Sequence, residues 1–155
     1  MSLPLLHSPA NILRQAMIQK GLASDPNGKP LAAWPAYEQT EPDEPDNCIT
    51  VNNTTPQLDG RSMLDGEQFQ HYGFQIRVRG IDQPTAFQKI EQIRVDLNEN
   101  LLDMQMTLST ADNRQATYDL NCVATLQVIS LGKNVPTTKR SLYTLNGKMP
   151  IIRIA

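Results

Sequence analysis

The sequence is poor in the side chains from which metal and nucleophilic sites are most often built. It holds two histidines, His7 and His71, and two cysteines, Cys48 and Cys122. Neither histidine lies two to five residues from a cysteine or from the other histidine, so zinc-ligand spacing is absent. We therefore expect no metal and no cofactor, and we expect both cysteines to be small buried side chains in a reducing compartment.

Signatures of nucleotide binding and of hydrolysis are also missing. The "NGK" stretch at 146–148 lacks the earlier glycine and the following Ser or Thr of a phosphate-binding loop, and Gly-x-Ser-x-Gly does not occur. The adjacent carboxylates Asp43 and Glu44 stand in a proline-rich stretch, where exposure to water gives them little advantage as acid or base. We therefore expect a protein that is not an enzyme.

No run of about 18 apolar residues is present, and "MSLPLLHSP" is not a secretory signal, so we expect a soluble protein made in a cytoplasm. The net charge of −2 argues against a surface that binds nucleic acid or membrane throughout. Residues 1–60 carry three basic and seven acidic side chains, whereas residues 113–155 carry six basic ones and only Asp119. This asymmetry fits attraction between neighbouring copies, local phosphate contact, or simply solvated faces.

Two amphipathic helices are predicted. The first begins at Ser8 and Pro9 and ends near Gly21, with apolar residues at helical spacing between them. The second begins at Asp82 and Pro84. Its apolar positions recur at steps of three and four: Ala86, Phe87, Ile90, Ile93, Leu97 and Leu101.

The strand pattern is clearest in "YGFQIRVRG", where Phe74, Ile76 and Val78 alternate with Arg77 and Arg79. We expect the apolar residues, together with Tyr72, to face the core and the arginines to face away from it. Further strands are predicted at 48–53, 104–110, 117–131, 141–145 and 149–155, with "NGK" as a turn. The order predicts one α+β domain over residues 1–155, with a mixed or mainly antiparallel sheet and both helices on one face.

Two segments are predicted to lack regular structure. Residues 22–47 hold five prolines and an acidic cluster, which favours an extended arm or long loop. Trp34 and Tyr37 are expected to anchor this arm, either on the same subunit or on a neighbour. Residues 55–67 are expected to form a mobile loop that is either functional or a plain exposed connection. Its polar residues are Gln57, Asp59, Arg61, Asp65 and Glu67.

A nucleic-acid-binding alternative depends on "HYGFQIRV", which loosely matches the aromatic strand motif of RNA-recognition domains. In this chain Phe74 shares its face with Ile76 and Val78, and a buried ring cannot stack on a base. The second aromatic motif is missing. A module for single-stranded nucleic acid is therefore the weaker interpretation, and burial of Phe74 would exclude it.

The stretch "FQIRVRGIDQPTAFQKIEQIRVDL", residues 74–97, resembles the tail-terminator and minor-capsid proteins of long-tailed bacteriophages. In that family a strand ending in Arg-x-Arg-Gly leads within a few residues into a helix that starts with an alanine-aromatic pair. The upstream "DNCITVNNT" and the opening helix "ANILRQAMIQKG" are also similar, so the resemblance covers about residues 8–108. The long arm at 22–47 departs from the family pattern.

The resemblance implies a structural virion protein, assembled in the host cytoplasm and located at the head-proximal end of the tail. Such proteins form a hexameric ring that caps the tail tube, stops its polymerisation and offers a docking surface to the head connector. DNA passes through the ring without sequence-specific binding, and no membrane is involved. A head-completion or stopper protein is the nearest alternative.

Within that interpretation the residue roles are hypotheses. Arg77 and Arg79 are candidates for the subunit interface, where the planar guanidinium suits a carboxylate of the adjacent copy. Alternatively both only cover the sheet with their stems. The polar loop at 55–67 is a candidate for contact with the lumen or with the adjoining ring.

Overall fold

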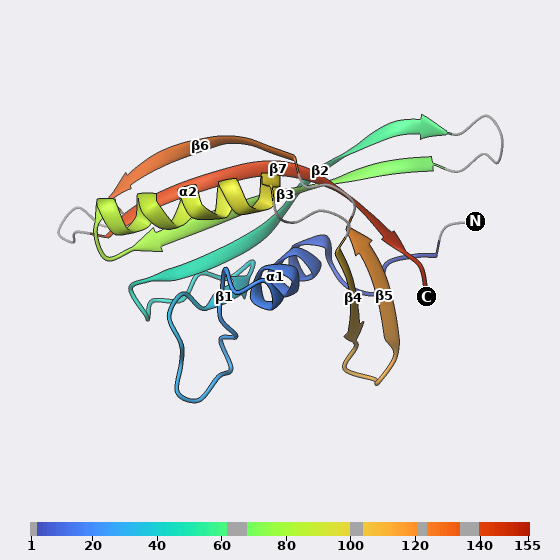
Figure 1. Ribbon diagram of the computed structural model, residues 1–155, viewed down its shortest axis with the longest axis horizontal. Coiled ribbons are helices and arrows are strands. Elements are labelled where there is room, and N and C mark those ends of the chain that lie inside the picture. The colour runs from blue at the N-terminus through green and yellow to red at the C-terminus, as the bar shows by residue number, and fades with distance from the viewer. Residues whose placement is uncertain (1–2, 62–67, 100–103, 121–123, 134–139) are drawn as a thin grey trace.

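The computed structural model describes residues 3–61, 68–99, 104–120, 124–133 and 140–155, and it is an α+β fold with a curled, mixed sheet (Figure 1). The elements in chain order are α1 (Pro9–Gln19), β1 (Ala36–Glu38), β2 (Cys48–Arg61), β3 (Gln68–Gly80), α2 (Gln83–Glu99), β4 (Met104–Ser109), β5 (Gln115–Leu120), β6 (Ala124–Lys133) and β7 (Ser141–Arg153).

The long strand β7 holds the sheet together. It pairs with β3 over its first ten residues, with β6 over nearly the same stretch, and with β5 near its end. All of these pairings are antiparallel, as are β2 with β3 and β4 with β5. The exception is the short β1, which runs parallel to β2 and makes the sheet mixed.

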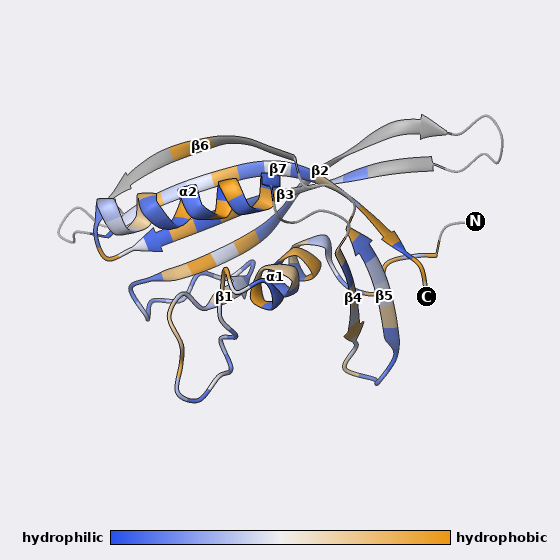
Figure 2. Ribbon diagram, in the orientation of Figure 1, coloured by the Kyte–Doolittle hydropathy of each residue, from blue (hydrophilic) through white to orange (hydrophobic). Residues whose placement is uncertain are grey.

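The core lies on one face of this sheet. Directly paired residues of adjacent strands share a face, and the pairs Ile49–Val78 and Ile76–Leu145 are fully or almost fully buried. Both helices add their apolar stripes to the same buried cluster, so both pack on this face. Figure 2 shows apolar positions on α1 and α2 where they approach the strands. The predicted α+β class is confirmed.

Helix starts follow the sequence signals. The Ser8 side chain accepts a hydrogen bond from Asn11 N, and Asp82 Oδ1 accepts one from Thr85 N at 2.9 Å. One predicted core position is wrong, because Phe87 is 43% exposed and its ring lies beside the α2 stripe. Leu101 lies outside the described residues.

Two predicted interruptions are in fact strand. The strand that begins at Cys48 does not end at Asn53 but continues to Arg61, with register shifts that follow Thr54 and Leu58. The "NGK" stretch is no turn, because Gly147 pairs with Phe74 on one side and with Thr125 on the other. Pairing on both edges outweighs the local turn preference of these residues.

The predicted strand at 117–131 is represented by β5 and β6, and the residues between them lie outside the described part of the chain. The arm is also less irregular than expected. It contains β1, and Ser24 forms a bridge with Pro35.

Gly80 fixes how closely β3 and α2 approach. A Cβ atom at this position would lie 2.7 Å from the backbone nitrogen of Ala86 and 2.8 Å from its Cβ. Only glycine allows this contact, so β3 and α2 approach each other closely where the strand turns into the helix.

Candidate functional site

The candidate site lies on the sheet face opposite the helices. Register places Arg77 beside Thr50 and Thr144, and Arg79 beside Cys48 and Leu142. The alternation therefore points both arginines away from the core, as predicted. The segment that covers them comes from the same chain: residues 41–47, which we call the acidic segment, fold back over this face.

Arg79 is buried beneath the acidic segment, with 2% of its surface exposed. Its Nη2 donates to the main-chain oxygens of Pro45 at 2.6 Å and Asp43 at 3.2 Å, and its Nε donates to that of Asp46 at 3.2 Å. One guanidinium thus holds three main-chain oxygens within four consecutive residues of an irregular segment, and its fixed fork of donors is well suited to this.

Arg77 is held more loosely. Its Nη2 lies 3.8 Å from Glu41 Oε2, and its side chain remains 32% exposed. The Nε of Arg77, the Oε1 of Glu41 and the Oγ1 of Thr50 are buried without a hydrogen-bond partner. The pair is an ion pair at long range and leaves polar atoms unsatisfied, so it contributes little to stability compared with Arg79.

A third arginine, Arg140, directly precedes β7 and also binds the acidic segment. Arg140 Nε donates to Asp46 Oδ1 at 2.7 Å, and its Nη2 lies 2.5 Å from the same oxygen and 2.9 Å from Asp43 O. Asp43 O therefore accepts from Arg79 and from Arg140. Together the three arginines and residues 41–47 form what we call the arginine clamp.

The clamp consists of contacts within one chain that the sequence prediction did not include. Arg79 is covered by its own chain, and the interface role of the arginine pair stays a prediction. Arg77 keeps part of its surface free. The sequence prediction missed Arg140 and the covering carbonyls because it treated the acidic segment as solvated. The opposite charges of the two ends of the chain were the signal that could have indicated this pairing.

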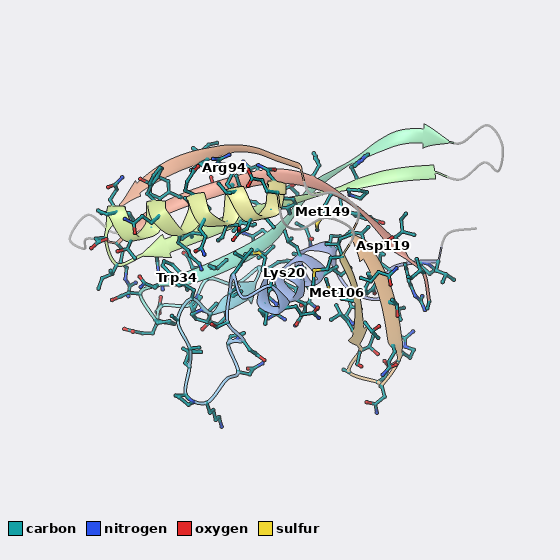
Figure 3. All side chains as sticks on the ribbon, in the orientation of Figure 1. Lys20, Trp34, Arg94, Met106, Asp119 and Met149 are labelled. Atoms are coloured by element: carbon teal, nitrogen blue, oxygen red, sulfur yellow. The ribbon has the colours of Figure 1, made fainter. Side chains whose placement is uncertain are left out.

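Both predicted arm anchors have contacts within their own chain. Trp34 packs against the core below α2 (Figure 3). Lys89 Nζ of α2 lies 5.6 Å from the centre of the Trp34 ring. Burial lowers the pKa of Lys89, because the charged form loses solvation. Tyr37 lies in β1 opposite Thr50, where burial raises the pKa of its hydroxyl.

The predicted loop at 55–67 is largely replaced by a two-stranded ribbon. Gln57, Asp59 and Arg61 belong to β2, and Gln57 and Arg61 pair with His71 and Gln68 of β3. Figure 1 shows this ribbon projecting away from both helices. Two further residues of the predicted loop, Asp65 and Glu67, lie outside the described residues.

Cys48 lies at the start of β2 and is fully buried. Burial, with a smaller opposing effect from the charge of Arg79, raises the pKa of its thiol from 9.0 to about 11. The thiol therefore stays protonated at neutral pH and is a poor nucleophile. Its place is structural, next to the clamp, as the sequence predicted for a small buried side chain.

Among the described residues, no three His, Cys, Asp or Glu side chains gather closely enough to hold a metal ion. Neither described helix is long and apolar enough to cross a membrane. The clamp orders the polypeptide and offers no nucleophile or acid-base pair aimed into a cavity. No protein-family model matches this sequence, and no curated protein matches it either.

Proposed function

We propose that this protein is a structural component of a bacteriophage virion that forms a ring, with six subunits expected, at the head-proximal end of the tail. In this role it caps the tail tube, stops its polymerisation and provides the docking surface for the head connector. The proposal starts from the resemblance of residues 74–97 to the tail-terminator and minor-capsid family.

The observation that carries the proposal is the ribbon formed by the distal parts of β2 and β3, which extends beyond the sheet (Figure 1). An isolated two-stranded hairpin is marginally stable in water. A ribbon of this length is therefore expected to gain stability by contact with another surface. In a ring that surface belongs to an adjacent subunit, to the tube or to the connector.

The strand-helix unit supports the same interpretation. Phe74, Ile76 and Val78 are fully buried against the helices, so the residues that resembled a nucleic-acid motif are used for packing. A base cannot stack on Phe74 in this fold. DNA that passes through the ring would not be read by these three side chains.

The test is the mass and shape of the purified protein, alone and mixed with tail tubes. Light scattering should give the mass of a closed ring, or electron micrographs should show the protein at one end of each tube. Binding to isolated head connectors but not to tubes would favour the stopper alternative. A strictly monomeric protein that joins neither assembly would refute the proposal.

A further inference from the structure

Residues 3–8, which we call the N-terminal strap, are fastened across β4, β5 and β7. Arg153 Nη1 donates to Pro4 O at 3.0 Å, and Leu5 and Leu6 pack against the core. The strap leads directly into the first turn of α1. Its central fastener is the hydroxyl of Tyr118, a β5 residue whose side chain is fully buried.

The Tyr118 hydroxyl has three partners. It accepts hydrogen bonds from the backbone nitrogens of Leu6, at 3.0 Å, and His7, at 3.1 Å. It also lies 2.7 Å from Nδ1 of the His7 ring. A hydroxyl has two acceptor lone pairs and one hydrogen to donate. The two backbone donors use both lone pairs, so the bond to the imidazole requires the hydroxyl to donate and Nδ1 to accept.

The other ring nitrogen completes this assignment. His7 Nε2 lies 3.1 Å from the main-chain oxygen of Ser109, the last residue of β4. A carbonyl oxygen can only accept, so Nε2 carries the hydrogen. The contacts therefore specify a neutral imidazole with its hydrogen on Nε2, and every group in the network is satisfied only in that form.

Protonation of the imidazole would disrupt the network. A hydrogen on Nδ1 would face the Tyr118 oxygen, whose lone pairs are already used, so one donor would face another. At least one of the three bonds to the hydroxyl must then break. The bond from Nε2 to Ser109 O survives protonation, so the loss is confined to the Tyr118 side of the ring.

Among the described residues, the imidazole makes hydrogen bonds only to uncharged groups, the Tyr118 hydroxyl and the Ser109 carbonyl. Charged groups on the adjoining elements have partners of their own. Arg153 of β7 bonds Pro4 O, and Glu38 of β1 accepts from Ser8 Oγ. In the turn after β4, Asp112 pairs with Arg114.

We propose that His7 and Tyr118 form an acid-sensitive fastener that releases the N-terminal strap when the His7 imidazole becomes protonated. Release would uncover the part of the core surface that Leu5 and Leu6 cover. The inference depends on the hydrogen-bond geometry and is independent of the proposed role in a phage tail.

Amide hydrogen exchange measured by NMR at pH 7.5 and pH 5.5 tests the fastener. The protection factors of the Leu6 and His7 amides should fall about fivefold or more at the lower pH, which is the effect of one lost hydrogen bond. The Ala10 amide, which donates to Asn53 Oδ1 at 2.8 Å, should keep its protection and serves as an internal reference.

The chain offers a matched control, because His71 is the only other histidine. In His7→Gln the pH dependence of Leu6 protection should vanish, whereas in His71→Gln it should persist. In Tyr118→Phe both strap amides should be unprotected at both pH values. Should that variant fail to fold, ¹⁵N shifts of the wild-type His7 ring give the second measurement.

Three results would overturn the inference. One is a Leu6 protection factor that is unchanged between the two pH values in the wild type. Another is a loss of protection that persists in His7→Gln. The last is a His7 ring that carries its hydrogen on Nδ1 at pH 7.5.

Discussion

Replacing Arg79 by methionine would remove the guanidinium of the arginine clamp while keeping most of the packing of its stem. Three main-chain oxygens, of Asp43, Pro45 and Asp46, would lose a charged donor. Asp43 O keeps its bond from Arg140 at 2.9 Å, so within the described part of the chain the oxygens of Pro45 and Asp46 lose their donor. At about 1–1.5 kcal/mol for each, the free energy of unfolding should fall by roughly 2–3 kcal/mol.

For a chain of this size that loss lowers the melting temperature by about 5–10 °C. Urea unfolding should be followed by circular dichroism and by the fluorescence of Trp34, the only tryptophan, which reports on the arm. The matched variant Arg77→Met, which removes a 3.8 Å ion pair, should cost less than about 1 kcal/mol. Equal losses for the two variants would refute the clamp as described.

Three further predictions test neighbouring features. Gly80→Ala should lower the free energy of unfolding, measured in urea, by about 1–3 kcal/mol. Adding Ala86→Gly should not restore stability, because the new Cβ would still lie 2.7 Å from the backbone nitrogen of residue 86. Full rescue by the double variant would contradict this close approach. The free energy of unfolding should decline as the pH rises from about 9 toward 11. Folding raises the pKa of Cys48 from 9.0 to about 11, so the protonated thiol stabilises the fold fully below pH 9 and this stabilisation is lost as the pH rises through 11. The Cys48→Ala variant should lack this part of the pH dependence, and identical slopes for the two proteins would exclude a contribution from Cys48. Arg77→Glu should weaken ring formation in light scattering if Arg77 lies at a subunit interface, whereas Arg114→Glu at an exposed turn should not; unchanged assembly in Arg77→Glu would remove the interface role.

The parts of the fold that the sequence predicts well are those with strong local signals. Ser8 with Pro9 begins α1, and the alternation through Phe74, Ile76 and Val78 gives the face of β3 correctly. In each case the side chains that identify the element are also the ones that pack. The periodicity and the tertiary structure therefore carry the same information.

The failures arise where distant pairing overrides local preference. Asn146 and Gly147 have the composition of a turn, yet β3 and β6 pair with this stretch from both edges and keep it extended. Residues 55–61 were expected to be part of a loop because of a proline and an Asp-Gly pair. The antiparallel partner strand holds them in the ribbon, with irregular register where those residues occur.

The candidate site was half predictable for a different reason. Alternation places Arg77 and Arg79 on the same face, but nothing local indicates that residues 41–47 return to cover one of them. Burial of Arg79 follows from main-chain carbonyls, which carry no signature in the sequence. The charge composition indicated only that the acidic and basic ends of the chain could attract each other. Asp46 and Arg140, 94 positions apart, do pair across that face.

The clamp changes what the charge asymmetry can do in assembly. Within the described residues, Glu41 and Asp46 already face Arg77 and Arg140 of the same chain, so part of the attraction between the acidic and basic ends acts inside the subunit. In the proposed ring, attraction between neighbouring copies would then come from charges outside the clamp, or from the exposed remainder of Arg77. Raising the salt concentration separates these contributions: bonds from Arg79 to buried carbonyls are screened little, whereas contacts between exposed charges on adjacent subunits weaken within a Debye length of about 8–10 Å. If attraction between exposed charges on adjacent subunits drives ring formation, rings should therefore be lost at salt concentrations that leave each subunit folded.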